Sequence, residues 1–163
     1  MKIRDADDSD LASILDIYND AIEHTTAVFD DTPHTLDARR QWFVAKQKAA
    51  LPVFVAVESE AVIGFATYGP FRPWPGYKYS VEHSVYVHPG ARRRGVGTAL
   101  VRAIVDEARS RDLHAIVAGI ATENEISLHL HKRLGFREVG HLVEVGYKFG
   151  RWLDLTLLQL SLH

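Results

Sequence analysis

The chain contains no cysteine among its 163 residues. This absence excludes disulfide bonds, a thiolate nucleophile and zinc sites built on cysteine, and it fits a reducing compartment. An excess of charge is also lacking, since 19 basic and 21 acidic side chains leave a net charge of −2 at neutral pH. No global field attracts nucleic acid or an anionic membrane, and we expect neither as a partner.

Long apolar runs are missing as well. No segment reaches membrane-spanning length, and the first five residues, MKIRD, are too polar for a secretory signal peptide. Repeats, linkers and low-complexity segments are absent. With 47% hydrophobic and 25% charged residues the composition is that of a globular protein. We therefore expect a single cytoplasmic domain over residues 1–163.

Strand and helix signals alternate along the chain, which predicts an α/β or α+β fold with a sheet covered by helices. A polar connection is expected at Thr25–His34, and prolines stiffen a loop at Gly69–Gly76. Strands are expected at Lys2–Ala6, Val53–Val57, Ala61–Tyr68, Tyr79–Val87, Ala115–Ala121, Glu138–Val145 and Leu153–Leu162. Helices are expected over 11–22 after a cap at Asp8 or Ser9, at Leu36–Ala49 after Thr35, from Val96 to about Arg111, and at Ile126–Leu134 before Gly135.

The most informative stretch is a strand, a basic turn and a helix. The strand ends at Pro89-Gly90, and Arg92-x-x-Gly95-x-Gly97 follows before apolar residues recur at helical spacing. Backbone N–H groups at a positive helix N-terminus suit a phosphate or pyrophosphate. A dinucleotide fingerprint would need glycine at Leu100, and a P-loop would need Gly-Lys-Ser/Thr, so neither is present.

An R-x-x-G-x-G turn after such a strand resembles motif A of the GCN5-related N-acetyltransferases (GNAT), in which the turn holds the pyrophosphate of acetyl-CoA. A second segment, Asn124-x-x-Ser127 through His131 to Gly135-Phe136, resembles motif B of that family. There the asparagine contacts the cofactor arm. The family often has tyrosine at the position of His131, as acid toward the departing CoA thiolate; an imidazolium could also donate a proton.

Two further segments resemble the phosphinothricin acetyltransferase branch, which includes enzymes for methionine sulfone and methionine sulfoximine. They are Tyr77 to Val87 and Gly146 to Asp154, and the resemblance spans nearly the whole chain. It implies the GNAT fold, a mixed and mostly antiparallel sheet flanked by about four helices. It also implies acetyl-CoA-dependent N-acetylation of a small amino-acid analogue by direct transfer in a ternary complex, and a homodimer.

The resemblance assigns cofactor contacts to the strand and the turn. Backbone groups of the strand would pair with the pantetheine arm, the turn would hold the pyrophosphate, and Asn124 would contact the arm from the other side. The predicted cofactor-binding residues are Val85, Tyr86, Val87, Arg92, Arg93, Arg94, Gly95, Val96, Gly97, Thr98 and Asn124.

Acetyl transfer to an amine needs a base, because an α-amine with a pKa of about 8 is mostly protonated at neutral pH. Glu82 is the candidate, because it stands just before the cofactor-binding stretch and the resemblance to the phosphinothricin branch implies a base at this position. Burial or a relay water would compensate for the weak basicity of an ordinary glutamate. The alternative is a glutamate that merely faces solvent. Together with His131, Glu82 completes the predicted catalytic residues.

The acceptor is expected at the stiff loop. Arg72 would clamp its carboxylate in a fork, and aromatic side chains would wall an apolar slot, although simple core packing could also explain Phe29 and Trp74. Phosphinothricin enzymes carry two cations in this loop, one of which Trp74 replaces here; this favours a sulfone or sulfoximine over a phosphinate. The predicted substrate-binding residues are Phe29, Arg72, Pro73, Trp74, Tyr77, Glu82, His83 and Ser84.

Two other kinds of function stay open: an acetyltransferase with a different acceptor, and a binding module without catalysis. A polyamine would require several acidic side chains near Glu82, none of which is evident, and a protein N-terminus would require an open groove. A non-catalytic acyl-CoA-binding or nucleic-acid module would rest on Arg92-Arg93-Arg94 alone. The nine histidines do not suggest a metal, because His129 and His131 point to different faces of a helix.

Overall fold

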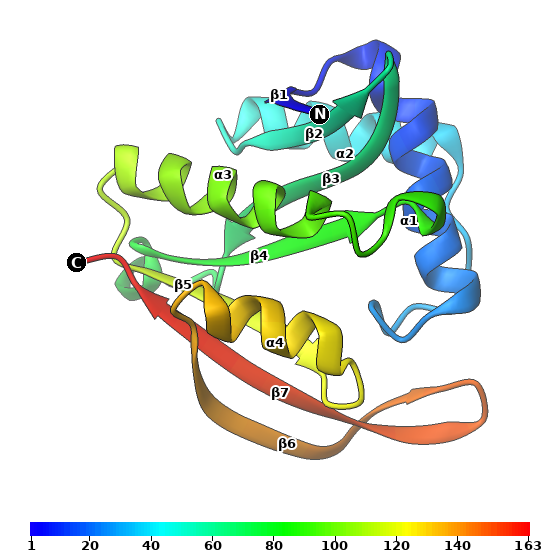
Figure 1. The fold of residues 1–163 in the computed structure, drawn as a ribbon. Coiled ribbons are helices and arrows are strands. Elements are labelled where there is room, and N and C mark those ends of the chain that lie inside the picture. The colour runs from blue at the N-terminus through cyan, green and yellow to red at the C-terminus, as the bar shows by residue number, and fades with distance from the viewer.

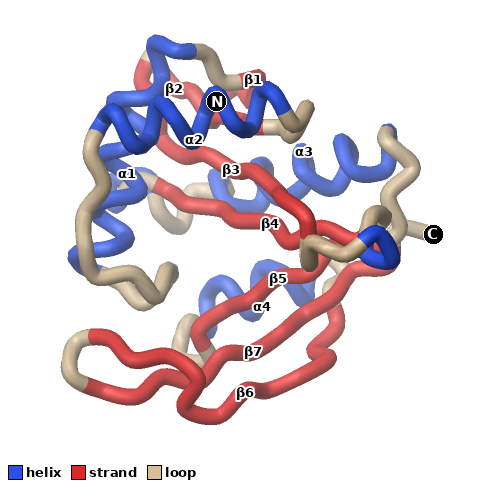
Figure 2. The backbone as a smooth tube through the Cα atoms, turned by 180° about the vertical axis from the view of Figure 1, so that it is seen from behind, coloured by secondary structure: helices blue, strands red, loops and turns tan.

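A computed structural model describes all residues 1–163. Its centre is one seven-stranded sheet of order β1-β2-β3-β4-β5-β7-β6, in which only β4 and β5 run parallel. Figures 1 and 2 show this twisted sheet from its two sides. The strands are β1 (Lys2–Asp5), β2 (Val53–Glu58), β3 (Ala61–Pro70), β4 (Ser80–Val87), β5 (Ala115–Ala121), β6 (Arg137–Lys148) and β7 (Arg151–Ser161).

Four α-helices cover the sheet, two on each face. In Figure 1, α3 and α4 lie in front of the sheet, and Figure 2 shows α1 and α2 on the opposite face. No helix is long and apolar enough to cross a membrane. The helices are α1 (Leu11–His24), α2 (Leu36–Lys48), α3 (Val96–Ser110) and α4 (Glu125–Arg133). This arrangement confirms the predicted mixed sheet flanked by about four helices.

Two apolar cores form between the helices and the sheet. The larger lies under α3 and α4 and contains Leu100, Ile104 and Phe136. The smaller lies under α1 and α2 and contains Ile14 and Phe65. Helical spacing of apolar residues in α1 and α3 directs their buried stripes onto the sheet. Each face of β4 therefore meets a different core.

Two element boundaries differ from the sequence expectation. Asp7, rather than Asp8 or Ser9, caps the start of the helical region, because its carboxylate accepts from the backbone N–H of Ser9 and a short 3₁₀ turn precedes α1. The last two strands are longer than predicted: they continue to a two-residue turn at Phe149-Gly150, where both residues have positive φ. Such φ values close tight β-hairpins.

Candidate active site

The parallel pair of strands separates at the centre of the sheet. β4 and β5 are paired only from Ser80 opposite Ala115 to Glu82 opposite Val117, and both continue unpaired with each other beyond that point. The two strands diverge visibly in Figure 2. A groove of about 1030 Å³ opens there between the end of β4, the start of α3 and the helix α4. The separation leaves the β5-facing backbone edge of β4 free for another extended chain.

The basic turn lies at one end of this groove. Gly95 has φ +82° and precedes the first residue of α3, with no side chain capping the helix. Uncapped N–H groups and the helix dipole favour an anion at this point. A Cβ at Gly97 would lie 3.2 Å from Leu130, so α3 and α4 approach closely beside the groove. The turn is thus shaped for a phosphate-bearing ligand.

The three arginines of the turn diverge. Arg92 and Arg93 line the groove, and Arg92 also donates to Asp20 at 3.2 Å. Arg94 instead forms an ion pair with Glu58 and is absent from the groove lining. Every other predicted cofactor-binding residue lines the groove, so ten of the eleven are brought together by the fold.

Helix α4 forms the opposite wall. The side chain of Asn124 accepts from the backbone N–H of Ser127 at 3.2 Å and caps the helix. Beside it, Glu123 receives two hydrogen bonds from Arg151 and one from Thr26. The bonds from Arg151, then that from Thr26, lower the pKa of Glu123 to about 2. This exposed ion pair and the bond from Thr26 join β7, the turn between β5 and α4, and the segment after α1.

His131 is buried beneath this wall, with 1% of its surface exposed. Its Nδ1 lies 2.7 Å from the carbonyl oxygen of Ser127, and its Nε2 lies 2.9 Å from Nε2 of His83. A carbonyl oxygen only accepts, so Nδ1 of His131 carries the proton and Nε2 of His131 is unprotonated. Nε2 of His83 therefore donates to Nε2 of His131. Burial lowers the pKa of both imidazoles, that of His83 to about 3. The pair is therefore neutral at physiological pH.

Alternation along β4 places Glu82 on the other side of the sheet. Tyr86 packs against Tyr18 of α1, whereas His83 packs against His131 of α4. Glu82 and Ser84 consequently share the α1 and α2 face with Tyr86, two residues apart along the strand. His83 is buried on the opposite face of the sheet, so the fold does not bring it together with Glu82.

Glu82 lies at the point where β4 and β5 part. Partial burial raises the pKa of its carboxyl, and the positive charge of Arg72 opposes that rise. A carboxylate with a raised pKa is a stronger base than an ordinary glutamate. The Arg72 guanidinium packs over the ring of Phe71 at 4.3 Å and donates to the Phe71 carbonyl. The fold thus brings a basic carboxylate and a guanidinium to the same region.

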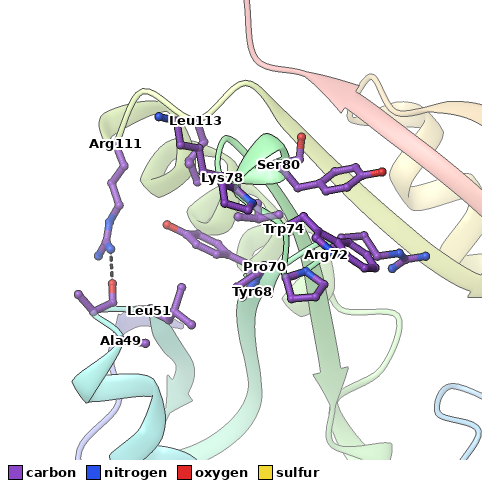
Figure 3. A pocket seen from close by; sticks show the side chains of 15 residues that line it. Ala49, Leu51, Tyr68, Pro70, Arg72, Trp74, Lys78, Ser80, Arg111 and Leu113 are labelled. Atoms are coloured by element: carbon purple, nitrogen blue, oxygen red, sulfur yellow. Dashed lines mark hydrogen bonds between the residues drawn. The ribbon is translucent and has the colours of Figure 1, made fainter.

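The proline-rich loop lies apart from the groove and lines a second cavity of about 420 Å³ (Figure 3). Arg72, Pro73, Trp74 and Tyr77 contribute to that cavity, but Glu82 does not. Trp74 is 64% exposed, which excludes the alternative of core packing for this side chain. Phe29 lies elsewhere, with its ring against Gly146 of β6. The predicted acceptor residues therefore come from three separate places around the divergence of β4 and β5.

Comparisons with known proteins decide the family. The model of the acetyltransferase (GNAT) family matches residues 12–136. The chain belongs to this family. It is 47% identical to the L-methionine sulfoximine/L-methionine sulfone acetyltransferase of Pseudomonas paraeruginosa, over 98% of this chain and 94% of the relative. Membership confirms the predicted family, fold and N-acetyltransferase activity.

Two solved structures are nearly superimposable on this GNAT chain. A Salmonella typhimurium acetyltransferase with its cofactor acetyl-CoA matches with a TM-score of 0.97 and 45% identity, covering 99% of this chain and 94% of that one. A ribosomal-protein-alanine N-acetyltransferase from Brucella melitensis matches with a TM-score of 0.97 and 45% identity, covering 99% of both chains. The prediction of acetyl-CoA as co-substrate is confirmed for this family member.

Sequence reasoning missed several groove residues. Most come from α4, from the β6–β7 turn, and from the end of α1 with the segment after it (Ala21, His24, Thr25, Thr26 and Ala27). Helical spacing from Asn124 could have identified Ser127, Leu130 and Leu134, because they recur on one face of α4. The groove residues outside the prediction include Arg102, Glu123, Ile126, His129, Arg133, Phe149 and Arg151.

Proposed function

We propose that this protein transfers the acetyl group of acetyl-CoA to the α-amine of a small amino acid with a polar, methionine-like side chain, such as methionine sulfone or methionine sulfoximine. The observation that carries this proposal is that the groove opens where β4 and β5 separate and that Glu82 lies at this same point. The pKa of Glu82 is raised. The 47% identity to a relative named for these acceptors supports the choice.

The groove fits acetyl-CoA. The unpaired edge of β4 at Val85–Val87 would receive the pantetheine arm through backbone hydrogen bonds, in the manner of an added strand. Arg93 and the uncapped N–H groups from Gly95 to Thr98 would hold the pyrophosphate. Bound acetyl-CoA supplies an acetyl thioester, and the protein's part is to place the amine beside it.

Glu82 would take the proton of the acceptor ammonium. Its raised pKa brings its basicity closer to that of the amine, and its exposure leaves room for a relay water. Arg72 would bind the acceptor carboxylate with its planar fork. Trp74 would present an apolar surface, which favours a sulfone or sulfoximine over the more anionic phosphinothricin.

His131 is less suited to the acid role expected of it. It lines the groove, yet one ring nitrogen donates to Ser127 and the other accepts from His83. Donating to the thiolate would require protonating a buried imidazole whose pKa is lowered by burial. We assign His131 a structural role, in which it ties α4 to β4 beside the groove.

We infer a homodimer in the cytoplasm. β6 is an edge strand, and seven large apolar side chains of the β6–β7 hairpin are exposed. Exposed apolar edges associate readily with a second copy. These residues are Val139, Leu142, Val143, Val145, Tyr147, Phe149 and Trp152. Sedimentation of the purified protein at micromolar concentration tests this, with a monomer as the contradicting result.

A protein N-terminus is a second candidate acceptor, since a solved structure at 45% identity is described as a ribosomal-protein-alanine N-acetyltransferase. Release of thiol from acetyl-CoA distinguishes the candidates when methionine sulfone, methionine sulfoximine, phosphinothricin, spermidine and an alanine-terminated peptide are supplied separately. We expect turnover with the first three, weakest with phosphinothricin. Turnover with only the peptide or spermidine would overturn the proposed acceptor, and absence of turnover with all five would overturn the proposed activity on these classes.

A further inference from the structure

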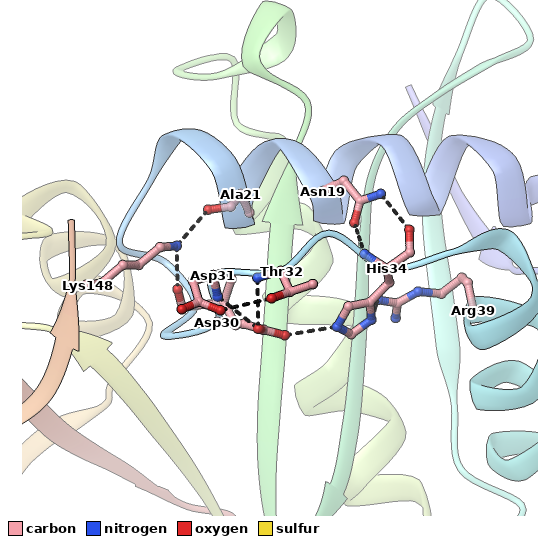
Figure 4. Close-up of polar contacts among 9 residues, drawn as sticks. Asn19, Ala21, Asp30, Asp31, Thr32, His34, Arg39 and Lys148 are labelled. Carbon is pink, nitrogen blue, oxygen red and sulfur yellow. Dashed lines mark hydrogen bonds and ion pairs between the residues drawn. The ribbon is translucent and has the colours of Figure 1, made fainter. Parts of the chain in front are cut away.

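Lys148, near the end of β6, is almost completely buried. Only 3% of its surface is exposed, and no carboxylate lies within ion-pair distance of its ammonium. Instead the ammonium donates to three backbone carbonyls, those of Thr25 at 2.6 Å, Val28 at 2.8 Å and Ala21 at 3.4 Å. Figure 4 shows the contact of Lys148 with Ala21 at the end of α1. A lysine has three N–H donors, and all three are used.

These carbonyls belong to the end of α1 and the segment that follows it. Orphan carbonyls at a helix C-terminus carry partial negative charge, which a cation stabilises. Burial lowers the pKa of Lys148, whereas the nearby Asp30 and Asp31 favour its charged form. The ammonium therefore joins two parts of the chain that lie more than a hundred residues apart in sequence.

The far end of the same segment has its own attachment. The side-chain amide of Asn19 accepts from the backbone N–H of His34 at 2.8 Å and donates to its carbonyl at 3.0 Å. Asp30 then accepts from Nε2 of His34 at 2.9 Å (Figure 4). These contacts fix residues 30–34 against α1, so the position of residues 25–29 depends on other contacts. Thr26 donates to Glu123 at 2.9 Å, and Lys148 holds the carbonyls of Thr25 and Val28, the latter next to Phe29.

Phe29 is the last of residues 25–29. Its ring lies so close to Gly146 that a Cβ placed there would be 2.4 Å from two ring carbons. Only glycine allows the aromatic ring to lie directly on the β6 backbone. Gly146 and Lys148 are two residues apart on the same strand, so one short piece of β6 receives both the ring and the carbonyls of this segment.

We propose that Lys148 is a positioning residue for the acceptor: it fastens residues 25–29 to β6, so that Phe29 is seated on Gly146 and forms one wall of the acceptor site. This inference rests on the proposed function, in which Phe29 contacts the acceptor side chain. Lys148 contacts no reacting atom. It acts through the segment that carries Phe29.

The absence of cysteine from the chain provides a sharp test. In Lys148→Cys the single thiol can be alkylated in denaturant with 2-bromoethylamine, which restores an ammonium on a side chain of lysine length, or with iodoacetamide, which adds a neutral amide. After refolding, the acceptor KM of the amide form should rise by about tenfold to a hundredfold, because hydrogen bonds from a buried charge are lost. The KM for acetyl-CoA should change less than the acceptor KM.

The ammonium form should recover most of the acceptor affinity. The control for refolding is wild-type protein taken through denaturation and treated with the same reagents. The control for loss of a charge is Lys48→Met, since Lys48 is exposed and has no hydrogen-bond partner. Equal KM values in the amide and ammonium forms would overturn the proposal. So would equal changes in the KM values of both substrates, because Thr25–Ala27 also line the groove and the effect of Lys148 would then not be specific to the acceptor.

Hydrogen exchange keeps this test separate from the proposed function, because it needs no acceptor. Exchange at residues 25–29 should accelerate in Lys148→Met while the core strands β3 and β5 stay protected. Gly146→Ala should displace Phe29, keep the Lys148 contacts, and raise the acceptor KM without accelerating exchange at Thr25. Unchanged exchange in Lys148→Met would refute the anchoring role even if the wild-type enzyme used a different acceptor.

Discussion

The buried pair His83–His131 makes the stability of this protein sensitive to acid. Both imidazoles are neutral in the fold, since one proton lies on Nδ1 of His131 and the other is donated by Nε2 of His83. Nδ1 of His83 has no hydrogen-bond partner among the side chains around it. A further proton on the pair would place an unpaired charge in an apolar environment beside Phe136.

The sign and size of the effect follow from linkage. In the unfolded chain His83 has its ordinary pKa of 6.5, whereas burial and the neighbouring His131 lower it to about 3 in the fold. The contribution of neutral His83 to the free energy of unfolding is fully present above pH 6.5. It is lost as the pH falls toward about 3, the pKa of His83 in the fold. Integration from pH 7 to pH 5 gives a loss of about 2 kcal/mol from His83 alone. The pKa of His131 is lowered as well, so its loss has the same sign.

Urea unfolding at pH 7 and pH 5 measures this loss, and His83→Leu/His131→Leu is the reference. Replacing both partners with apolar side chains removes the titration without leaving a buried donor unpaired. The free energy of unfolding should fall between pH 7 and pH 5 by at least about 2 kcal/mol more in the wild type than in the double variant, because His131 adds to the loss from His83. Equal losses in the two proteins would refute the neutral buried pair.

Three further predictions concern the site. Glu82→Gln should lower kcat about 10²–10⁴-fold with little change in the dissociation constant of acetyl-CoA, measured by steady-state kinetics and calorimetry; a kcat within threefold of wild type would exclude Glu82 as the base. Because partial burial raises the pKa of Glu82, the acidic limb of the kcat/KM profile should lie above the ordinary glutamate pKa of 4.5 and vanish in Glu82→Gln. Gly95→Ala places a side chain at φ +82°, which should cost about 1 kcal/mol of stability and weaken acetyl-CoA binding more than acceptor binding; unaltered acetyl-CoA affinity would contradict the role of the turn.

Features that depend on residues close together in the sequence could be predicted. Gly95 and Gly97 marked a turn at a helix N-terminus, and the structure has it there, because positive φ and close helix packing each require glycine. The seven strands and four helices were also predictable, since apolar periodicity directs each element onto the sheet. The length of the last hairpin was underestimated, because positive φ at Phe149 is not visible in its residue type.

Long-range partners could not be predicted in the same way. Arg94 turns to Glu58, which is 36 positions away, and nothing in the motif separates it from Arg93. Lys148 lies beyond the predicted strand end at Val145, and nothing in the sequence indicates that the end of α1 packs against it. The separation of His83 from Glu82, in contrast, could be predicted, because neighbouring residues of a strand point to opposite faces of the sheet.

The central claim is that the acetyl group goes to the α-amine of a small amino acid. It is tested most directly by competition, in which limiting acetyl-CoA is supplied to the enzyme with equal concentrations of methionine sulfone, spermidine and an alanine-terminated peptide. Mass spectrometry then shows which amine carries the acetyl group. We predict N-acetylmethionine sulfone as the dominant product, and an acetyl group found mainly on the peptide or on spermidine would contradict the claim.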